Sequence, residues 1–390
     1  MSLLSSTFTN LSELTNGFGH FTLDLYQQYV QSTNGNVIFS PVSILNVLAV
    51  LSTAANGVTY EQMNKSLYFN DNKTFTANQF YEINRFLKNN DEKTSLLIAN
   101  RIYANGRYTI NKTFENIAAN KFSCEIEALN FDKNTEAARN INNFVAEKTN
   151  SQIRDFIEPD RIQKDTCVIL INAIYFKGHW KQKFNKMLTS AGNFYVNKNK
   201  TVQVDFMRMN GGFRFIDYYE FELNASVLEI EYTNSKYSFI IVLPRSRTGL
   251  SQLERKLKKF NLKRLSQDLV SRYPLEVDVR IPKFKVRMAI KLDDLLKKLG
   301  MVDIFDPHKA DLREILDTNQ QLHVSDAHHT AFIDVNEDGS EAAAASSLFL
   351  HLLSAQPSVN LFHADHPFVY YIWNKEIEAA IFIGRITKFD

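Results

Sequence analysis

The chain of 390 residues lacks several features that define whole classes of protein. It has only two cysteines, Cys124 and Cys167, which excludes the disulfide framework of small secreted domains and fits a reducing compartment. Its 13 glycines and 8 prolines are scattered, which excludes a collagen-like or linker-rich chain. No apolar run approaches the roughly 18 residues of a membrane span, so no membrane partner is expected. The 45 basic and 43 acidic residues nearly balance, so charge alone predicts no nucleic-acid partner.

The N-terminal segment, Met1 to Glu13, is polar and lacks the basic start and apolar stretch of a signal peptide. We therefore expect a cytoplasmic protein. Secretion by an unconventional route is the alternative. In that case five glycosylation sequons would become meaningful, at Asn10, Asn64, Asn72, Asn111 and Asn224.

The chain is rich in aromatic residues, with 30 Phe and 16 Tyr, which favour strands and a bulky core. The first 150 residues are mostly helical in pattern, with helices expected at 14–31, 41–55, 77–87 and 135–149. The apolar, β-branched run 166–176 is typical of a strand buried on both faces. Helices are expected near 250–260 and 291–299, and strands at 202–209, 225–232, 237–243, 275–280, 284–289, 367–371 and 379–386. Because helices and strands do not alternate strictly, the predicted fold class is α+β.

No sequence motif of enzyme chemistry occurs in the chain. There is no G-x-S-x-G elbow, H-E-x-x-H pair, Walker loop or G-x-G-x-x-G. His328 and His329 are adjacent rather than helically spaced, and two lone cysteines do not make a zinc site. We therefore expect no catalytic residues, no metal and no obligatory cofactor.

A basic stretch lies between residues 253 and 264. Helical spacing places Leu253, Leu257 and Phe260 on one buried face and the cations on the other. The cations are a solvated helix face in one interpretation and a site for a sulfated glycosaminoglycan, a heparin-like activator, in the other. They are Arg255, Lys256, Lys258, Lys259, Lys263 and Arg264.

The segment from Glu337 to Ser347 consists mainly of Ala and Ser. Alanine favours helix, so an exposed Ala-rich turn or short helix is one interpretation. As a strand, the segment would place Ser340, Ala342, Ala344 and Ser346 on one face and Glu341, Ala343, Ala345 and Ser347 on the other. Small side chains would let such a segment enter between two existing strands, with Glu341 in solvent. The pattern therefore indicates a loop that can become a strand.

Five separated motifs resemble those of the serpin family, in that family's order. The resemblance extends from near Leu14 to the C-terminus and is greatest to the intracellular, ovalbumin-type branch. The motifs are Asn36-Val-Ile-Phe-Ser-Pro-Val-Ser-Ile44, Asn172-Ala-Ile-Tyr-Phe-Lys-Gly-His-Trp180, Ile281-Pro-Lys-Phe284, Ala331-Phe-Ile-Asp-Val-Asn-Glu-Asp-Gly339 and Phe362-His-Ala-Asp-His-Pro-Phe368.

The resemblance implies a single domain over residues 1–390, with three β-sheets, about nine helices and an exposed reactive-centre loop at about 337–361. It implies a monomeric inhibitor, not an enzyme. A target serine protease would cleave the loop as a suicide substrate and stay bound as an acyl-enzyme while the loop inserts into the central sheet.

The resemblance also assigns roles to individual residues. Counting sixteen residues on from Glu337 places the reactive bond at Leu353-Ser354. Leucine there fits the apolar specificity site of chymotrypsin-like proteases: chymotrypsin, cathepsin G, chymase or elastase. The hinge would comprise Glu337, Gly339, Ser340, Glu341, Ala342, Ala343, Ala344 and Ala345. Ser40, Ser43, Asn172 and His329 match the "shutter" beneath the central strands, and Trp180, Lys283 and Glu337 match the "breach", with an ion pair between Lys283 and Glu337.

Two alternatives to serine protease inhibition stay open. One is a non-inhibitory serpin that acts as a binding or chaperone-like protein, although such relatives often carry bulky, charged or proline residues in the hinge. The other is a cross-class inhibitor of papain-like cysteine proteases.

Overall fold

A computed structural model describes residues 2–88, 93–218, 222–317, 320–339 and 359–389, with the side chains of residues 2–13 and 218 left aside. Nine α-helices lie within these ranges: α1 (Ser2–Ser32), α2 (Pro41–Ala54), α3 (Gly57–Leu67), α4 (Lys73–Leu87), α5 (Lys112–Phe122), α6 (Asn134–Lys148), α7 (Leu250–Leu257), α8 (Leu262–Val270) and α9 (Asp293–Lys298). The described strands are β1 (Val37–Phe39), β2 (Thr94–Asn105), β3 (Glu125–Leu129), β4 (Val168–Gly178), β5 (Ser190–Tyr195), β6 (Thr201–Tyr218), β7 (Ala225–Glu231), β8 (Tyr237–Pro244), β9 (Leu275–Pro282), β10 (Phe284–Lys291), β11 (Val324–Val335), β12 (Asn360–His363), β13 (Phe368–Asn374) and β14 (Ala379–Ile386). The predicted α+β class is confirmed.

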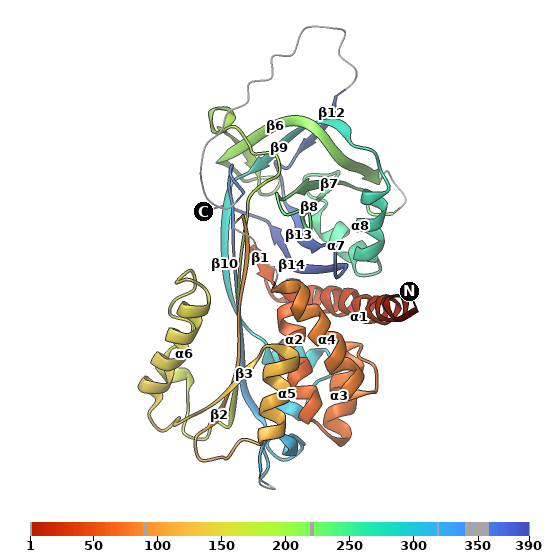
Figure 1. The fold of residues 1–390 in the computed structure, drawn as a ribbon. Helices are drawn as coiled ribbons and strands as arrows, with labels where there is room; N and C mark the ends of the chain where they lie inside the picture. Colours follow the sequence, from red (N-terminus) through yellow and green to blue (C-terminus); the bar gives the residue numbers. More distant parts are fainter. Residues whose placement is uncertain (1, 89–92, 219–221, 318–319, 340–358, 390) are drawn as a thin grey trace.

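A five-stranded sheet with the order β10-β11-β4-β2-β3 forms the long axis of the molecule. Its two central strands, β11 and β4, run parallel, whereas β10 and β2 are antiparallel to their neighbours β11 and β4. Figure 1 shows this sheet nearly edge-on, with α6 on one side and α2 to α5 on the other. Helices therefore cover both faces of the sheet, which explains why β4 is buried along almost its whole length.

The remaining strands form a second network in the order β1-β14-β13-β8-β7-β6-β9-β12, with β5 also paired to β6. The 18-residue strand β6 pairs with β5 and β9 along its first part and with β7 along its last part. Two of the three expected sheets thus share one long strand. In Figure 1 this network lies at one end of the five-stranded sheet.

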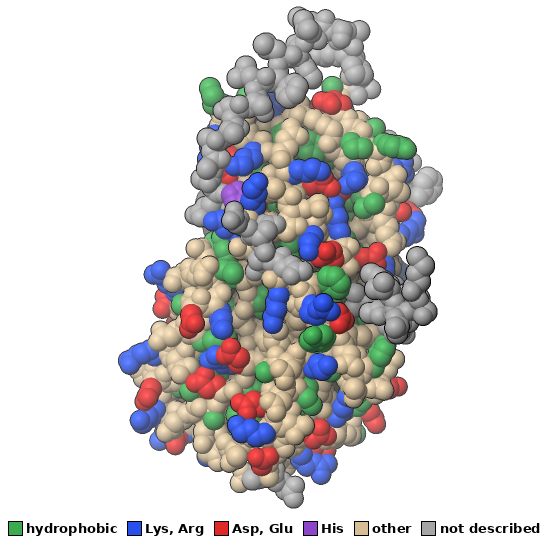
Figure 2. Space-filling model, viewed as in Figure 1, with side chains coloured by type: hydrophobic (Ala, Val, Ile, Leu, Met, Phe, Trp, Pro, Cys, Tyr) green, Lys and Arg blue, Asp and Glu red, His purple; other side chains and the backbone are tan. Residues whose placement is uncertain are grey.

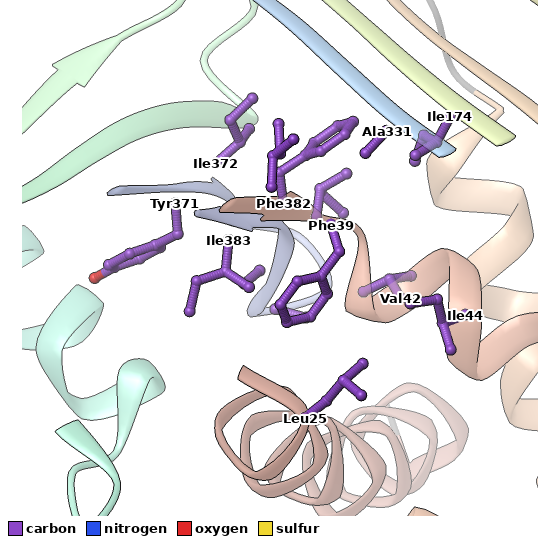
Figure 3. Packing of buried hydrophobic residues seen from close by; sticks show 14 of the residues in the cluster. Leu25, Phe39, Val42, Ile44, Ile174, Ala331, Tyr371, Ile372, Phe382 and Ile383 are labelled. Atoms are coloured by element: carbon purple, nitrogen blue, oxygen red, sulfur yellow. The ribbon is translucent and has the colours of Figure 1, made fainter. Parts of the chain in front are cut away.

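The main hydrophobic core lies where the two sheets meet α1 and α2. Figure 3 shows Leu25 of α1, Val42 of α2 and Phe382 of β14 in one hydrophobic cluster with Ile174 and Ala331, which are register partners in β4 and β11. A second, smaller core packs α6 against the other face of the five-stranded sheet, through Ile141 and Phe144. The central strands are therefore held between two packed layers.

Local sequence explains the start of α2. Pro41 occupies the first turn, where its missing N–H costs no hydrogen bond, and the Ser40 hydroxyl accepts from the Ser43 N–H at 3.3 Å. Ser40 is therefore a helix cap as well as a candidate shutter residue.

The predicted helix near 250–260 is present as α7 but ends at Leu257, and α8 was not predicted. Phe260 lies in the turn between these two helices, half-buried. Leu253 and Leu257 are buried as expected. Helix α8 begins after Asn261, because the Asn261 side chain accepts hydrogen bonds from the backbone N–H groups of Lys263 and Arg264 and so caps the helix.

Basic and acidic side chains are interspersed over the visible face of the molecule (Figure 2). None of the described helices is both long and apolar enough to cross a membrane. Both cysteines are free and buried.

Candidate functional site

The first candidate hinge residues follow the carboxyl end of β11. They lie at one end of the seam, the line along which the parallel strands β11 and β4 pair. After β11 ends at Val335, the chain turns, and Gly339 pairs with both Asn336 and His179. Because His179 directly follows β4, Gly339 already lies between the ends of the two central strands. Glycine is required at this position for two reasons. Its φ is +108°, which other residues rarely adopt, and a Cβ there would collide with the carbonyl oxygen of Gly178.

The Glu337 carboxylate is held from two sides. Lys283 Nζ lies 3.0 Å from its Oε2, which confirms the predicted ion pair, and the Thr189 hydroxyl donates to its Oε1 at 2.8 Å. Burial alone raises the pKa of Glu337, but hydrogen bonds from the backbone, Thr189 and Lys283 hold it below its ordinary value. Glu337 is therefore a charged anchor at the base of the loop.

Asp338 is a second anchor that the sequence analysis did not identify. Its carboxylate lies 2.7 Å from Lys186 Nζ and 3.4 Å from Lys183 Nζ. Burial alone raises the pKa of Asp338, but these two lysines hold it below its ordinary value. Its backbone carbonyl accepts from the Trp180 N–H at 3.1 Å. The segment after β4 thus holds the hinge through both side chains and backbone.

Trp180, the third candidate breach residue, packs against the turn that contains Glu337. Its indole is fully buried, stacks on Tyr232 at 4.5 Å between ring centroids, and donates from Nε1 to the Asn336 carbonyl at 2.8 Å. The structure therefore brings Trp180, Lys283 and Glu337 together, as expected. An open cavity of about 720 Å³ lies beside them, lined by Lys186, Lys283 and Glu337 among others.

The four candidate shutter residues form one buried network halfway down the seam. Asn172 Nδ2 donates to the Ser43 hydroxyl at 2.6 Å and to the Ser43 carbonyl at 3.0 Å, while Asn172 Oδ1 bonds His329 Nδ1. The Ser40 N–H donates to His329 Nε2 at 3.0 Å. Asn100 of β2, which the sequence analysis missed, accepts from Asn172. The network links α2 to the three strands β2, β4 and β11.

These contacts fix the charge and tautomer of His329. Nε2 accepts a hydrogen bond, so it carries no proton, and Nδ1 must then donate to Asn172. Burial lowers the pKa of His329 to about 3, because the ring is wholly enclosed. A proton on Nε2 would face the Ser40 N–H, so the network requires neutral histidine.

Two of the six cations in the predicted basic stretch pair with acidic side chains. Lys263 is only 13% exposed and pairs with Glu378 at 2.6 Å, and Arg264 pairs with Glu222 at 3.1 Å. No ion pair within the described residues involves the other four cations, Arg255, Lys256, Lys258 and Lys259.

The rest of the predicted site lies outside the described residues. This applies to the reactive bond Leu353-Ser354 and to the hinge residues Ser340, Glu341 and 342–345. The described chain resumes just before β12, at Val359. Within the described ranges, no group of three His, Cys, Asp or Glu side chains is arranged to hold a metal ion.

Comparisons with known proteins agree on one family. A family model described as Serpin (serine protease inhibitor) matches residues 16–389. Antichymotrypsin-2 of Bombyx mori is 36% identical over 369 residues, which are 93% of this chain and 96% of that protein. The structure of Serpin48 from Tenebrio molitor matches with a TM-score of 0.86 at 29% identity, covering 97% of this chain and 99% of that one. Native protease nexin-1 with heparin matches with a TM-score of 0.87 at 28% identity, covering 97% and 100%. The chain therefore belongs to the serpin family.

Proposed function

We propose that this serpin inhibits a chymotrypsin-like serine protease by trapping it at Leu353-Ser354. The observation that carries the proposal is the double pairing of Gly339, with Asn336 on one side and His179 on the other. Gly339, directly before the loop, therefore already bridges the ends of β11 and β4. Antichymotrypsin-2, at 36% identity, supports the target class by its name.

Continuing the two pairings of Gly339 predicts the register of an inserted loop. From Asn336, each step back along β11 is one step forward along the loop, so Ala342 would lie opposite Ile333. From His179, the same count places Ala342 opposite Phe176. Ile333 and Phe176 are partners in the present sheet, so the loop could enter without any slip between β11 and β4.

This register also predicts which loop side chains would be buried. Val335, Ile333, Ala331 and His329 of β11 are all buried in the core. Their partners would be Ser340, Ala342, Ala344 and Ser346, all small or short polar residues. Glu341 would lie on the opposite face. The loop composition therefore fits a new strand that packs against the same core as β11.

Insertion of the loop as a new strand is expected to be favourable in free energy, as an irreversible trap requires. Parallel pairs such as β11 and β4 are slightly less stable per residue than antiparallel pairs, and the loop would be antiparallel to both strands. Roughly a dozen new strand residues, at about 0.5–1.5 kcal/mol net per hydrogen bond, would contribute on the order of 10 kcal/mol.

The chemistry follows from the protease's own reaction. Its serine would attack the Leu353 carbonyl, forming an ester and releasing the amine of Ser354 as a new N-terminus. Insertion would then carry the ester-linked protease away before water completes the hydrolysis.

A covalent complex tests this proposal. Mixing the protein with chymotrypsin should give an SDS-stable complex and a released peptide that begins at Ser354, identified by mass spectrometry. Leu353→Arg should transfer complex formation to trypsin-like enzymes, because the residue before the cleaved bond sets specificity.

The same assay separates the alternatives. If chymotrypsin, cathepsin G, chymase and elastase all fail to form a complex, the proposal is wrong. Cleavage without any complex would favour the non-inhibitory serpin, and a complex with papain would favour cross-class inhibition.

We also propose that Arg255, Lys256, Lys258 and Lys259 bind a heparin-like polyanion. The reason is their lack of ion pairs within the described ranges, and the heparin-bound neighbour protease nexin-1 offers an analogy. Replacing Lys256, Lys258 and Lys259 by Gln should abolish salt-sensitive retention on a heparin column. Lys263→Gln, at a paired cation, should leave retention nearly unchanged. Absence of retention in the parent protein would end this proposal.

A further inference from the structure

A polar cavity of about 310 Å³ lies at the amino-terminal ends of β4 and β11. Its lining comes from opposite sides of the seam. Asp165 and Thr166 precede β4, and His323 precedes β11. Two cations also line the cavity: Arg161, at the end of a 3₁₀ turn after α6, and Lys297 of α9. The cavity is therefore at the far end of the seam from the hinge.

Two cations of the cavity lining have no ion pair among the residues that the structure describes. Lys291 is engaged by both Asp293, at 3.2 Å, and Asp326, at 2.9 Å. Arg161 and Lys297 have no acidic partner within the described part of the chain, although Lys297 Nζ lies over the Phe305 ring, 5.3 Å from its centroid. Asp165 is the one lining carboxylate that is also without an ion pair there. The formal charges of the lining cancel, three cations against three carboxylates, so an added carboxylate would be held by the two cations outside these ion pairs, Arg161 and Lys297.

The register of the hinge leads to this cavity from both strands. Counted from Asn336, Leu352 would lie opposite His323 and Leu353 opposite Leu322. Counted from His179, Leu352 would lie opposite Thr166 and Leu353 opposite Asp165. His323, Thr166 and Asp165 all line the cavity. The register of β11 against β4 shifts by one residue between Val324 and Asp326, so the two counts agree to within one residue at this end of the strands. Both counts place the end of a cleaved, inserted loop at the cavity.

We propose that this cavity binds the new C-terminal carboxylate of Leu353 in the cleaved protein, through Arg161 and Lys297. The inference rests on the loop insertion proposed above. The carboxylate forms when water cleaves the ester between Leu353 and the protease serine, which returns the serine hydroxyl and releases a proton. A guanidinium and an ammonium give charge-assisted hydrogen bonds to a carboxylate. The ester lacks that charge, so the cavity stabilises the cleaved product and not the covalent complex.

Two synthetic peptides test the cavity on the intact protein. Both have the sequence Ser340–Leu353, one with a free C-terminal carboxylate and one with a C-terminal amide. Annealing into the seam is followed by the rise in melting temperature with peptide concentration. We expect the acid to anneal at roughly tenfold lower concentration than the amide, the effect of one charge-assisted contact.

Paired variants locate the effect. Arg161→Gln with Lys297→Gln should abolish the difference between acid and amide, whereas Lys298→Gln, on the same helix but outside the cavity lining, should preserve it. Equal annealing of the two peptides to the parent protein would overturn the cavity proposal and leave insertion intact. Failure of both peptides to anneal would overturn insertion itself, and the cavity with it.

Discussion

Ser340→Arg should convert the proposed inhibitor into a substrate. In the register set by Gly339, residue 340 would lie opposite Val335, which is buried against the core, so insertion would carry the guanidinium out of water. An unpaired buried charge costs several kcal/mol, and each 1.4 kcal/mol slows a step about tenfold. Hydrolysis of the ester would then outrun insertion. We expect the yield of SDS-stable complex to fall by at least about tenfold, while cleavage of the loop continues at its former rate.

Glu341→Arg is the matched control for this prediction. Residue 341 would lie opposite Asp334, on the other face of the strand, so its charge would stay in solvent. Its complex yield should stay close to that of the parent protein. Full inhibition by Ser340→Arg, or equal loss in both variants, would contradict insertion in this register.

The sequence predicted the strands whose pattern is set locally. The segment 166–176 was predicted as a doubly buried strand, and β4 spans Val168–Gly178. β14 was predicted at its observed bounds, Ala379–Ile386. By contrast, β2 and β11 were not predicted. They lie between layers of helices and carry polar residues for specific partners, so neither strict alternation nor a continuous apolar run marks them.

The candidate site was predicted only where a motif identified a residue. The motifs predicted Asn172 and His329, but Asn100 joins them from β2, 72 residues away from Asn172. An amide within the apolar run around Asn100 was the available signal. Asp338, Lys183, Lys186 and Thr189 could not be predicted as a group, because their contacts depend on how the segment after β4 folds back over the hinge.

The candidate hinge and shutter residues lie along the same pair of strands, β11 and β4. His329 and Asn172 are register partners across β11 and β4, so a loop inserted between these strands must break their side-chain contact. In the proposed register, Ser346 would lie opposite His329. Its hydroxyl could then replace a lost hydrogen-bond partner. We infer that the small residues Ser340 and 342–345 permit insertion, whereas the hydroxyl of Ser346 limits its cost in free energy at the candidate shutter.

Acid should therefore destabilise the closed sheet through His329. The pKa of this ring is about 3 in the folded protein, because of burial, and about 6.5 in an unfolded chain. Between these values the unfolded chain binds more protons, so the free energy of unfolding falls as pH decreases below 6.5. The slope is about 1.4 kcal/mol per pH unit, or roughly 2–3 kcal/mol between pH 6.5 and 4.5. Urea unfolding at a series of pH values measures it.

The window above pH 4.5 isolates histidine, because the strongest carboxylate effects come at lower pH. Glu231 and Asp326 have folded pKa values of about 2, so their contributions are lost mainly below the ordinary carboxylate range near 4. His179 and His323 also have lowered pKa values because of burial, and add smaller slopes of the same sign. His329→Gln should be less stable at pH 7.5 but should lose most of the slope, whereas His179→Gln should keep it. A slope that persists in His329→Gln would show that the shutter histidine is not the group that acid protonates.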